Sequence, residues 1–553
     1  MSNSSKRILL STFLLLLPIL AYLYFVRQLS FTQDDAYITY RYVANYLNGD
    51  GLVFNIGERV EGFTNFGWTV LLILVGGFKG DYIAFSKILG TIFGAGVIVV
   101  TFLTARRLIS SKNYWFSFLP PFLLGANMAL AYWSQSGLET AAFAFMAALS
   151  VYFYLTKSRW LILALTLAVW TRPEGALVAI ILILTEGIVE KKLPRYSFSC
   201  ALIAFILSIP FVLFKYFYYG SILPNPFYAK TGMSLEQVQA GLEYTGLFLK
   251  HYGFYGAGII LPILFWKKLD TNLKSVLIFT CAYILYVILI GGDVLKVHRF
   301  FLPIFGLSAI LISAVIRVMS QRLSLQARAL VSFSLFIFLI SATYMLPMDH
   351  IKLYLDREQG LVTSMSFLAT NIKKTDSSNF TAAVSTIGIF SHLLLGHQVT
   401  DMLGLTDSTI ARHSQSKNEE FETTWRERNY NAEYVLSCKP DYIVFSTGVK
   451  PSAPAEQALL IYSQFVENYV SLTWYQPKHE NETIDLFGFA FKKIRDFGGR
   501  IVPTYPAKYV HHYKKMCDFS TKRMYREAIQ QCDSAIAISP KPFLGDMIVE
   551  DAY

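Results

Sequence analysis

The stretch KRILLSTFLLLLPILAYLYFVRQLSFTQDD, residues 6–35, decides the fold class. From Ile8 to Val26 it carries no charge and is long enough to cross the roughly 30 Å of hydrocarbon in a bilayer, with Lys6 and Arg7 directly before it. A cleaved signal peptide would have a shorter apolar region and a cleavage site of small residues, whereas aromatic residues and an arginine end this run. We therefore expect a retained membrane anchor.

Further apolar runs follow this anchor, and together with it they predict about eleven membrane spans. The runs cover about residues 83–104, 114–133, 138–154, 160–170, 176–189, 198–214, 254–266, 276–291, 300–315 and 330–346. The run at 160–170 would reach only about 16 Å, at a rise of about 1.5 Å per residue. We expect that helix to end inside the membrane or at a cavity.

The composition agrees with a polytopic membrane protein. Of the 553 residues, 54% are hydrophobic and only 16% are charged, whereas soluble globular proteins carry roughly 25% charged residues. A soluble chain of this length would split into domains with charged surfaces. The 16% of aromatic residues exclude a disordered chain, and only five cysteines among so many residues exclude a disulfide scaffold. The cysteines show no metal-ligand spacing such as CxxC.

The lysine and arginine residues behind the net charge of +11 are distributed unevenly among the loops between the predicted spans. If the N-terminus lies in the cytoplasm, lysine and arginine gather on the cytoplasmic loops, and the loop after Trp133 on the opposite side has none. The cytoplasmic set is Arg106, Arg107, Lys112, Lys157, Arg159, Lys191, Lys192, Arg195, Lys267, Lys268, Lys274, Arg317, Arg322 and Arg328. This bias explains the positive charge, so we expect membrane lipids and no nucleic acid as partners.

The hydropathy changes after residue 346, which predicts three parts. They are a multi-span membrane domain at 1–346 with a first outer loop at 28–81, a soluble α/β domain on the outer side at 347–500, and a helical extension at 501–553. Strand-like runs lie at 442–445 and 487–491.

The helical extension contains one short pattern. The spacing of the second helix of a tetratricopeptide unit is present at Ala528, Cys532, Ala535 and Pro540. One such unit cannot bury its own apolar face, so we expect a helical hairpin packed on the soluble domain.

Two adjacent carboxylates, Asp34 and Asp35, begin the first outer loop a few residues after the first span. Tyr37, Tyr40 and Arg41 follow at helical spacing. An interfacial amphipathic helix would explain the tyrosines, and the helix dipole favours acids in its first turn. It does not explain why two acids lie so near lipid, so a functional role and a structural role both remain open.

The sequence DDAYITYRYVANYLNGDGLVFNIGERVEGFTNFGW, residues 34–68, resembles the opening signature of a family of lipid-sugar-dependent glycosyltransferases with a GT-C fold. That family is similar to the terminal β-(1→2)-arabinofuranosyltransferase of mycobacteria. Further blocks match the family in the same order: SGLET (136–140), TRPEG (171–175), YYGSILPNPFYAK (218–230), GGDVLKVHRFFLP (291–303) and DMLGLTD (401–407). The resemblance implies a polytopic α-helical, GT-C-like membrane protein with a C-terminal soluble α/β domain. From about residue 501 onward nothing matches.

The resemblance also implies a reaction. A polyprenyl phosphate leaves the anomeric carbon of the donor sugar while an acceptor hydroxyl attacks, and that hydroxyl needs a base nearby. In a pair of carboxylates, one can accept the proton while the other is held by a cation or a hydrogen bond. Inversion needs one base and no covalent intermediate. Asp34 or Asp35 would be this base; we favour Asp34, and the choice stays open.

The leaving phosphate is an anion, so it needs charge stabilisation more than a proton. Lys230, His298 and Arg299 lie in predicted outer loops beside spans, and an arginine can hold a phosphate through two hydrogen bonds. The alternative is that these side chains are ordinary interfacial cations.

Other residues of the matching blocks are candidates for the substrate cavity. Glu139, Arg172 and Glu174 lie in or near apolar runs, where ionisable groups are costly and usually face a cavity or one another. A structural ion pair that orients the short span is the alternative. The remaining cavity candidates are Tyr37, Arg41, Glu61, Asn225 and Asp293. Asp401 and Asp407 either contact the acceptor or cap helices.

The sequence does not decide whether a metal is used. Asp34, Asp35 and Asp293 would suit Mg²⁺ or Mn²⁺, but nothing requires a divalent cation. HxxxH and CxxC pairs and a glycine-rich phosphate loop are missing from the sequence, so the donor is expected to be a lipid and not a nucleotide.

The main prediction is a bacterial inner-membrane glycosyltransferase with an extracytoplasmic C-terminal domain. It would move a sugar from a polyprenyl-phosphate donor to an envelope glycan, lipid or protein on the outer face. The alternative is a transporter or flippase of lipid-linked sugars, for which inverted repeats would be typical and are not seen. The sugar and the acceptor stay open.

Overall fold

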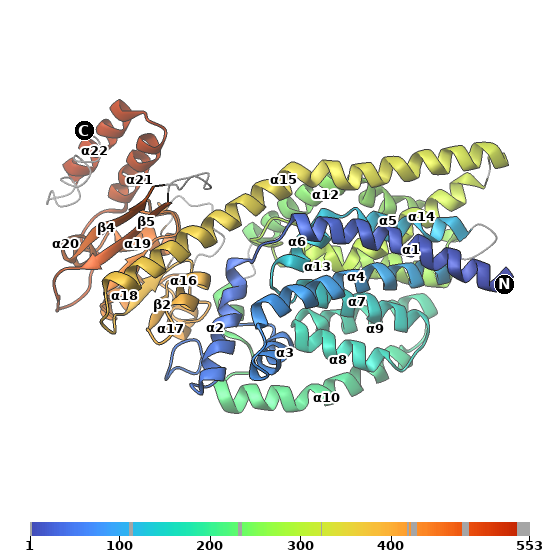
Figure 1. Ribbon diagram of the computed structural model, residues 1–553, viewed down its shortest axis with the longest axis horizontal. Coiled ribbons are helices and arrows are strands. Elements are labelled where there is room, and N and C mark those ends of the chain that lie inside the picture. Colours follow the sequence, from blue (N-terminus) through green and yellow to red (C-terminus); the bar gives the residue numbers. More distant parts are fainter. Residues whose placement is uncertain are drawn as a thin grey trace. The chain divides into compact units, whose positions relative to one another are not determined.

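The computed structural model describes residues 3–109, 114–230, 235–321, 323–416, 418, 420–421, 429–477 and 486–538 (Figure 1). The chain forms two compact units. The helical unit comprises Met1–Gln33, Thr64–Lys215 and Gly232–Gln359, and the sheet unit comprises Asp34–Phe63, Tyr216–Thr231 and Gly360–Tyr553. Two loops from the N-terminal half of the chain therefore belong to the unit that holds the β-sheet.

The helical unit is built from long apolar helices and shorter helices between them. Their bounds are α1 Asn3–Gln28, α3 Phe66–Gly77, α4 Tyr82–Ile109, η1 Tyr114–Ser117, α5 Leu119–Gly125, α6 Met128–Gln135, α7 Thr140–Leu155, α8 Leu161–Thr171, α9 Glu174–Glu190, α10 Arg195–Tyr219, α12 Leu235–Leu264, η2 Trp266–Lys268, α13 Thr271–Leu289, η3 Arg299–Phe301, α14 Leu302–Ser320 and α15 Leu325–Thr375. Helices α10 and α15 each carry the chain from the helical unit into the sheet unit.

Within the described residues, six helices are long and apolar enough to cross a membrane. They are Tyr82–Ile109, Arg195–Tyr219, Leu235–Leu264, Thr271–Leu289, Arg299–Ser320 and Gln326–Thr375. Four shorter apolar helices lie at Thr12–Gln28, Phe66–Gly77, Thr140–Leu155 and Leu161–Thr171. The last of these is the short run expected at 160–170. A polytopic helical protein is confirmed, and the number of about eleven spans stays a prediction.

The centre of the helical unit is closely packed. Helix α14 is buried along most of its length, whereas α10 exposes many large apolar side chains, as a lipid-facing helix would. On α4, a Cβ added at Gly90 would collide with the Ser134 carbonyl oxygen of α6, and one added at Gly94 would collide with the Tyr22 hydroxyl of α1. These two glycines, four residues apart, let the helices approach closely.

The sheet unit holds one mixed five-stranded sheet in the order β2-β1-β3-β5-β4. The strands are β1 Ala382–Val384, β2 Val399–Asp401, β3 Tyr442–Val444, β4 Tyr469–Gln476 and β5 Leu486–Lys493. Strands β2, β1 and β3 run parallel, with Val384 opposite both Asp401 and Val444, and β5 pairs antiparallel with β3 and β4. The expected strands near 442–445 and 487–491 are β3 and β5.

Further helices lie in the same unit as this sheet. They are α2 Asp34–Asn48, α11 Asn225–Lys230, α16 Gly388–Leu393, α17 Ser408–Arg412, α18 Ala432–Ser437, α19 Pro454–Leu459 and α20 Ser463–Asn468. The first two come from the loops of the N-terminal half. A sheet-containing part after the long apolar helices is confirmed, and the segment Asp34–Phe63, expected in the first outer loop, belongs to the same unit.

Residues 507–538 form a hairpin of two helices, α21 Ala507–Thr521 and α22 Tyr525–Ile538. Ala528, Cys532 and Ala535 of α22 are buried in the same apolar core as Phe445 and Phe491 of the sheet. The hairpin thus packs on the sheet; Pro540 lies outside the described residues. The expected boundary at residue 346 lies inside α15, which runs from Leu325 to Thr375. The three-part division of the chain stays a prediction.

Candidate functional site

Helix α2 presents the Asp34–Asp35 pair within the sheet unit. The Asp34 carboxylate accepts hydrogen bonds from the backbone N–H groups of Gly388 (3.0 Å) and Ile389 (2.9 Å), the first two residues of α16. These N–H groups have no partner inside their own helix, and the helix dipole favours an anion there. Asp34 is therefore an N-terminal cap for α16, although about 354 residues separate the two in sequence.

Arg41, two turns along α2, holds the other end of α16. Its guanidinium donates to the carbonyl oxygens of Ser391, Leu394 (3.2 Å) and His397 (2.7 Å), and also to Phe54 and Asn55 in the loop after α2. The last carbonyls of a helix lack intrahelical partners and favour a cation. Asp34 and Arg41 together form what we call the α2–α16 clamp.

Close approach in the clamp depends on Gly388. A Cβ at this position would collide with the backbone oxygen and the carboxyl group of Asp34. Burial raises the pKa of Asp34 to about 6, against the lowering effect of the hydrogen bonds from Ile389 and Gly388. Burial also lowers the pKa of Arg41 to about 10. Arg41 thus stays charged at neutral pH.

Asp35 has a different environment from Asp34. Its side chain is half-buried, and among the described residues it makes no hydrogen bond or salt bridge. The neighbouring Tyr37 packs edge-on against Tyr40, with ring centroids 5.4 Å apart, and contacts His392 of α16 at 5.6 Å. Of the two acids, Asp35 is the one whose carboxylate is not already committed to the fold.

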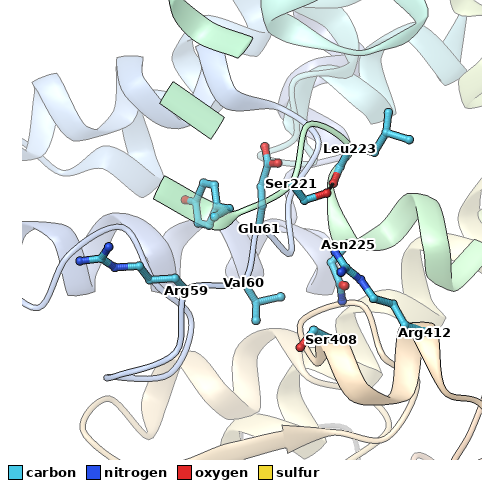
Figure 2. A pocket seen from close by; sticks show the side chains of 9 residues that line it. Arg59, Val60, Glu61, Ser221, Leu223, Asn225, Ser408 and Arg412 are labelled. Atoms are coloured by element: carbon cyan, nitrogen blue, oxygen red, sulfur yellow. Dashed lines mark hydrogen bonds between the residues drawn. The ribbon is translucent and has the colours of Figure 1, made fainter. Parts of the chain in front are cut away.

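The loop after α2 meets the LPNPF segment in the same unit. The backbone N–H of Asn225 donates to the Glu61 carbonyl at 2.8 Å, and the Asn225 side-chain amide donates to the carbonyl oxygens of Gly404, Leu405 and Asp407. Both Glu61 and Asn225 are buried. A cavity of about 130 Å³ lies between these segments and α17 (Figure 2).

The two acids of the DMLGLTD block, Asp401 and Asp407, accept hydrogen bonds from nearby backbone N–H groups. Asp401 accepts hydrogen bonds from the N–H groups of Leu403 (2.9 Å) and Thr406 (2.8 Å), and burial raises its pKa to about 6. Asp407 accepts from the N–H of Ile410 and caps α17, and it also accepts from the Tyr434 hydroxyl. Asp407 thus takes the helix-capping role that was left open, whereas Asp401 accepts hydrogen bonds from the turn that follows β2.

The SGLET and TRPEG blocks meet in the helical unit. Arg172, just after α8, donates to Glu139 (2.7 Å) before α7 and forms two hydrogen bonds with Glu174 (2.7 and 3.2 Å) at the start of α9. Asn65 donates to the other Glu139 oxygen at 2.8 Å. All three charged side chains are largely buried. The ion pair that was the alternative to a cavity role at the short span is present, and it joins the ends of three helices.

The HRF segment of the same unit carries a second ion pair. Arg299 donates from Nε and Nη2 to both oxygens of Asp293, each at 2.8 Å. The Phe300 ring lies 5.5 Å from the guanidinium carbons of both Arg299 and Arg172, so it contacts both ion pairs. Two arginines therefore face three carboxylates in this cluster.

His298 and Lys230 complete the predicted site residues. His298 is fully buried, its Nε2 lies 2.8 Å from Nδ1 of His251, and burial lowers its pKa well below the usual value. It is therefore a neutral imidazole at pH 7. Lys230 is the last residue of α11, and its side chain lies outside the described part of the structure.

The predicted residues thus fall into two groups, each held within one unit. Asp34, Asp35, Tyr37, Arg41, Glu61 and Asn225 lie in the sheet unit, and Glu139, Arg172, Glu174, Asp293, His298 and Arg299 lie in the helical unit. The described residues contain no group of three or more His, Cys, Asp or Glu side chains arranged to hold a metal ion. Sequence reasoning missed Asn65, Phe300 and Gly388; the first two lie in matching blocks, which was their only signal.

Comparison with known proteins relates the chain to membrane glycosyltransferases. Residues 351–487 match a family described as Domain of unknown function (DUF8728). The terminal β-(1→2)-arabinofuranosyltransferase of Mycobacterium tuberculosis is 28% identical over 260 residues, which cover 40% of this chain and 38% of that protein. The protein of the same name from Corynebacterium glutamicum is 25% identical over 330 residues, which cover 50% and 46%. The chain thus spans less than half the length of these curated relatives.

Two solved structures share its architecture. The archaeal oligosaccharyltransferase AglB from Archaeoglobus fulgidus, in complex with an inhibitory peptide and a dolichol-phosphate, matches with a TM-score of 0.53 at 13% identity, over 98% of this chain and 85% of that one. ArnT from Cupriavidus metallidurans, bound to undecaprenyl phosphate, matches with a TM-score of 0.50 at 11% identity, over 74% and 88%. The chain has the GT-C fold. The resemblance inferred from the loop signature is confirmed at the level of this GT-C fold and of similarity to arabinofuranosyltransferases.

Proposed function

We propose that this GT-C protein is an integral-membrane glycosyltransferase that moves a sugar from a polyprenyl-phosphate donor to an acceptor on the outer face of the membrane. The observation that carries the proposal is the sequence similarity to two curated arabinofuranosyltransferases. Two structural neighbours whose names specify dolichol-phosphate and undecaprenyl phosphate support a lipid-linked donor. The acceptor is a glycan, lipid or protein of the envelope.

We assign the general base to Asp35, in preference to the Asp34 favoured by the sequence. Asp34 is buried against two N–H groups of α16, so its lone pairs already serve the fold. Asp35 is half-buried and makes no hydrogen bond or ion pair within the described residues, which leaves its oxygens able to take a proton from an acceptor hydroxyl. Attack on the face opposite the phosphate then inverts the anomeric centre.

Arg299 and Lys230 are the candidates for the donor phosphate. Asp293 holds the Arg299 guanidinium through two hydrogen bonds, which fixes the orientation of its planar fork. His298 is less suited to this role because it is neutral and bonded to His251. We assign His298 to packing beside the phosphate site. A divalent cation at the acids is compatible with the proposal and not required by it.

The proposed orientation follows the loop charges. The N-terminus and the loops rich in lysine and arginine face the cytoplasm, and the sheet unit lies outside the bacterial inner membrane. A lipid-linked sugar would then present its headgroup at the outer boundary.

The proposal is tested with purified full-length protein and a panel of lipid-linked sugars extracted from the native host. The expected result is consumption of one donor together with release of polyprenyl phosphate and formation of a glycosylated acceptor. The alternative, a flippase, predicts no release of polyprenyl phosphate but movement of intact donor across proteoliposomes. Movement without release would overturn the enzymatic proposal.

A further inference from the structure

The turn that leads to Arg299 has an unusual backbone. It runs from Gly291 to His298, between α13 and η3. Its last residue, His298, has φ 57° and ψ 28°, in the left-handed region that residues other than glycine rarely adopt. His298 is fully buried, and a residue keeps such a conformation only when its surroundings hold it there. The contacts of His298 therefore determine how the chain enters Arg299, the arginine proposed to hold the donor phosphate.

His251 of α12 is the hydrogen-bond partner of His298. Its Nδ1 lies 2.8 Å from Nε2 of His298, with an angle of 85° between the rings, and His251 is only 5% exposed. Nδ1 of His298 has no hydrogen-bond partner among the described residues. A proton on that atom would be a buried N–H without an acceptor, so the His298 proton belongs on Nε2. Nδ1 of His251 is then the acceptor.

Helix α12 also contacts the two residues after Arg299. The backbone N–H of Phe300 donates to the Tyr244 hydroxyl at 3.4 Å, and the Phe301 ring stacks on Phe248 with centroids 4.1 Å apart. Arg299 is thus attached to α12 on both sides, by the histidine before it and by the two phenylalanines after it. Of the two polar contacts the imidazole pair is the shorter, at 2.8 Å against 3.4 Å.

The orientation of the Arg299 guanidinium depends on this backbone. Its Nε and Nη2 donate to the two oxygens of Asp293, which lies in the same turn, at 2.8 Å each. The Trp133 ring lies 5.4 Å from the guanidinium carbon, and its Nε1 donates to the Val297 carbonyl, again in the turn, at 2.6 Å. A rotation of the backbone at His298 would move the guanidinium relative to these partners. It would therefore turn the plane that the phosphate has to meet.

From these contacts we infer that His251 is a positioning residue for the donor phosphate site and acts through His298 on Arg299; the inference rests on the proposed function. Loss of this hydrogen bond would leave the buried Nε2–H of His298 unpaired and would favour relaxation of the strained backbone. The alternative is a contact that only stabilises the helical unit. The two differ in one respect: a positioning effect of His251 depends on Arg299, and a structural effect does not.

The test is a double-mutant cycle on the binding of a polyprenyl phosphate to the full-length protein in detergent, measured by microscale thermophoresis. His251→Leu should raise Kd about tenfold, as for the loss of one buried hydrogen bond. Arg299→Lys should also raise Kd, because the planar fork is lost. In the double variant Kd should equal that of Arg299→Lys within about twofold, since no guanidinium is left to position.

Two further variants separate position from folding. His251→Asn places its side-chain oxygen near the position of Nδ1 and should bind like the wild type. His251→Gln places its amide one bond further out and should bind like His251→Leu. Both are neutral and polar, so their comparison holds even where the leucine variant fails to fold. The matched control is Leu249→Asn, on the exposed side of the same helical turn, which should leave Kd unchanged.

The inference is overturned if His251→Leu binds like the wild type, if His251→Asn and His251→Gln bind alike, or if Leu249→Asn weakens binding as much as His251→Leu. It is also overturned if the two effects multiply in the double variant, because His251 would then act independently of Arg299. Absence of polyprenyl-phosphate binding in the wild type would overturn it as well.

The fate of the proposed enzyme is read separately, from consumption of a lipid-linked donor. If binding depends on His251 through Arg299 but no donor is consumed, the positioning role stands and the enzyme falls. If transfer is present and its donor KM is the same in the wild type and His251→Leu, the positioning role falls and the enzyme stands.

Discussion

Arg299 shows how one residue's role depends on its geometry and not only on its charge. Asp293 fixes two of its N–H donors, so the guanidinium plane has a set orientation beside Phe300. Arg299→Lys keeps the charge but loses the planar fork. We expect the donor KM to rise about tenfold or more, as for the loss of a charge-assisted hydrogen bond. Donor titrations with saturating acceptor measure this. An unchanged donor KM would make Arg299 an interfacial anchor and leave Lys230 as the phosphate ligand.

The raised pKa of Asp34 makes the free energy of unfolding depend on pH. Its pKa is raised from 3.8 to about 6 in the folded protein, so folding favours the protonated carboxyl. Its contribution to the free energy of unfolding is fully present below about pH 4 and is lost as the pH rises through about 6. The melting temperature of the wild type minus that of Asp34→Asn should therefore fall across this window. A constant difference would mean that the two α16 N–H groups compensate the buried charge fully.

At the scale of secondary-structure elements, the α2–α16 clamp can be tested by a substitution at Gly388 of α16. Gly388→Ala would place a methyl group into the backbone and carboxyl group of Asp34, which separates the helices or strains them. Overpacking of this kind costs about 1–3 kcal/mol, so the melting temperature should drop and transfer should weaken. Gly360→Ala is the control, because nothing lies within 4 Å of its added Cβ and alanine favours a helix interior. Equal melting temperatures for the two variants would show that α16 can move away freely.

The same clamp marks the limit of sequence-based prediction. The closeness of charged residues to lipid singled out the Asp34–Asp35 pair and the Arg172–Glu174 pair, because a charge in such a place is costly. Arg41 was named from its helical spacing in the matching signature. The partner of Arg172 was found because it lies two residues away. The partners of Asp34 and Arg41 are backbone groups of α16, which have no side-chain signature and lie about 350 residues along the chain. The different environments of Asp34 and Asp35 could therefore not be predicted from the sequence, and the catalytic role of the pair stays a proposal.

At the scale of the whole molecule, hydropathy was enough for the fold class. Long apolar runs define the helices and the polar remainder defines the sheet. Hydropathy does not show that the loops at 34–63 and 216–231 belong to the sheet unit, because that depends on hydrogen bonds between distant segments, such as Asn225 with Gly404 and Asn55 with Val399.

The orientation of the chain is a separate prediction at this scale. Reporter fusions after Arg107, Arg195 and Arg328 should report the cytoplasm, since these loops carry the excess of lysine and arginine. Fusions after Lys230 and at Pro347 should report the outer side. A cytoplasmic signal at Pro347 would put the sheet unit, and Asp35 with it, on the wrong face for an outer-leaflet reaction.

The most direct test of the account compares transfer and donor binding in Asp35→Asn. The asparagine keeps the shape of the side chain but cannot accept the acceptor's proton, so transfer should fall by about 10²–10⁴-fold. Donor affinity and melting temperature should stay near those of the wild type, because Asp35 makes no hydrogen bond or ion pair among the described residues. The measurement is release of polyprenyl phosphate and labelled product in single turnovers with purified protein. Near-normal transfer by Asp35→Asn would contradict the assignment of Asp35 as the base.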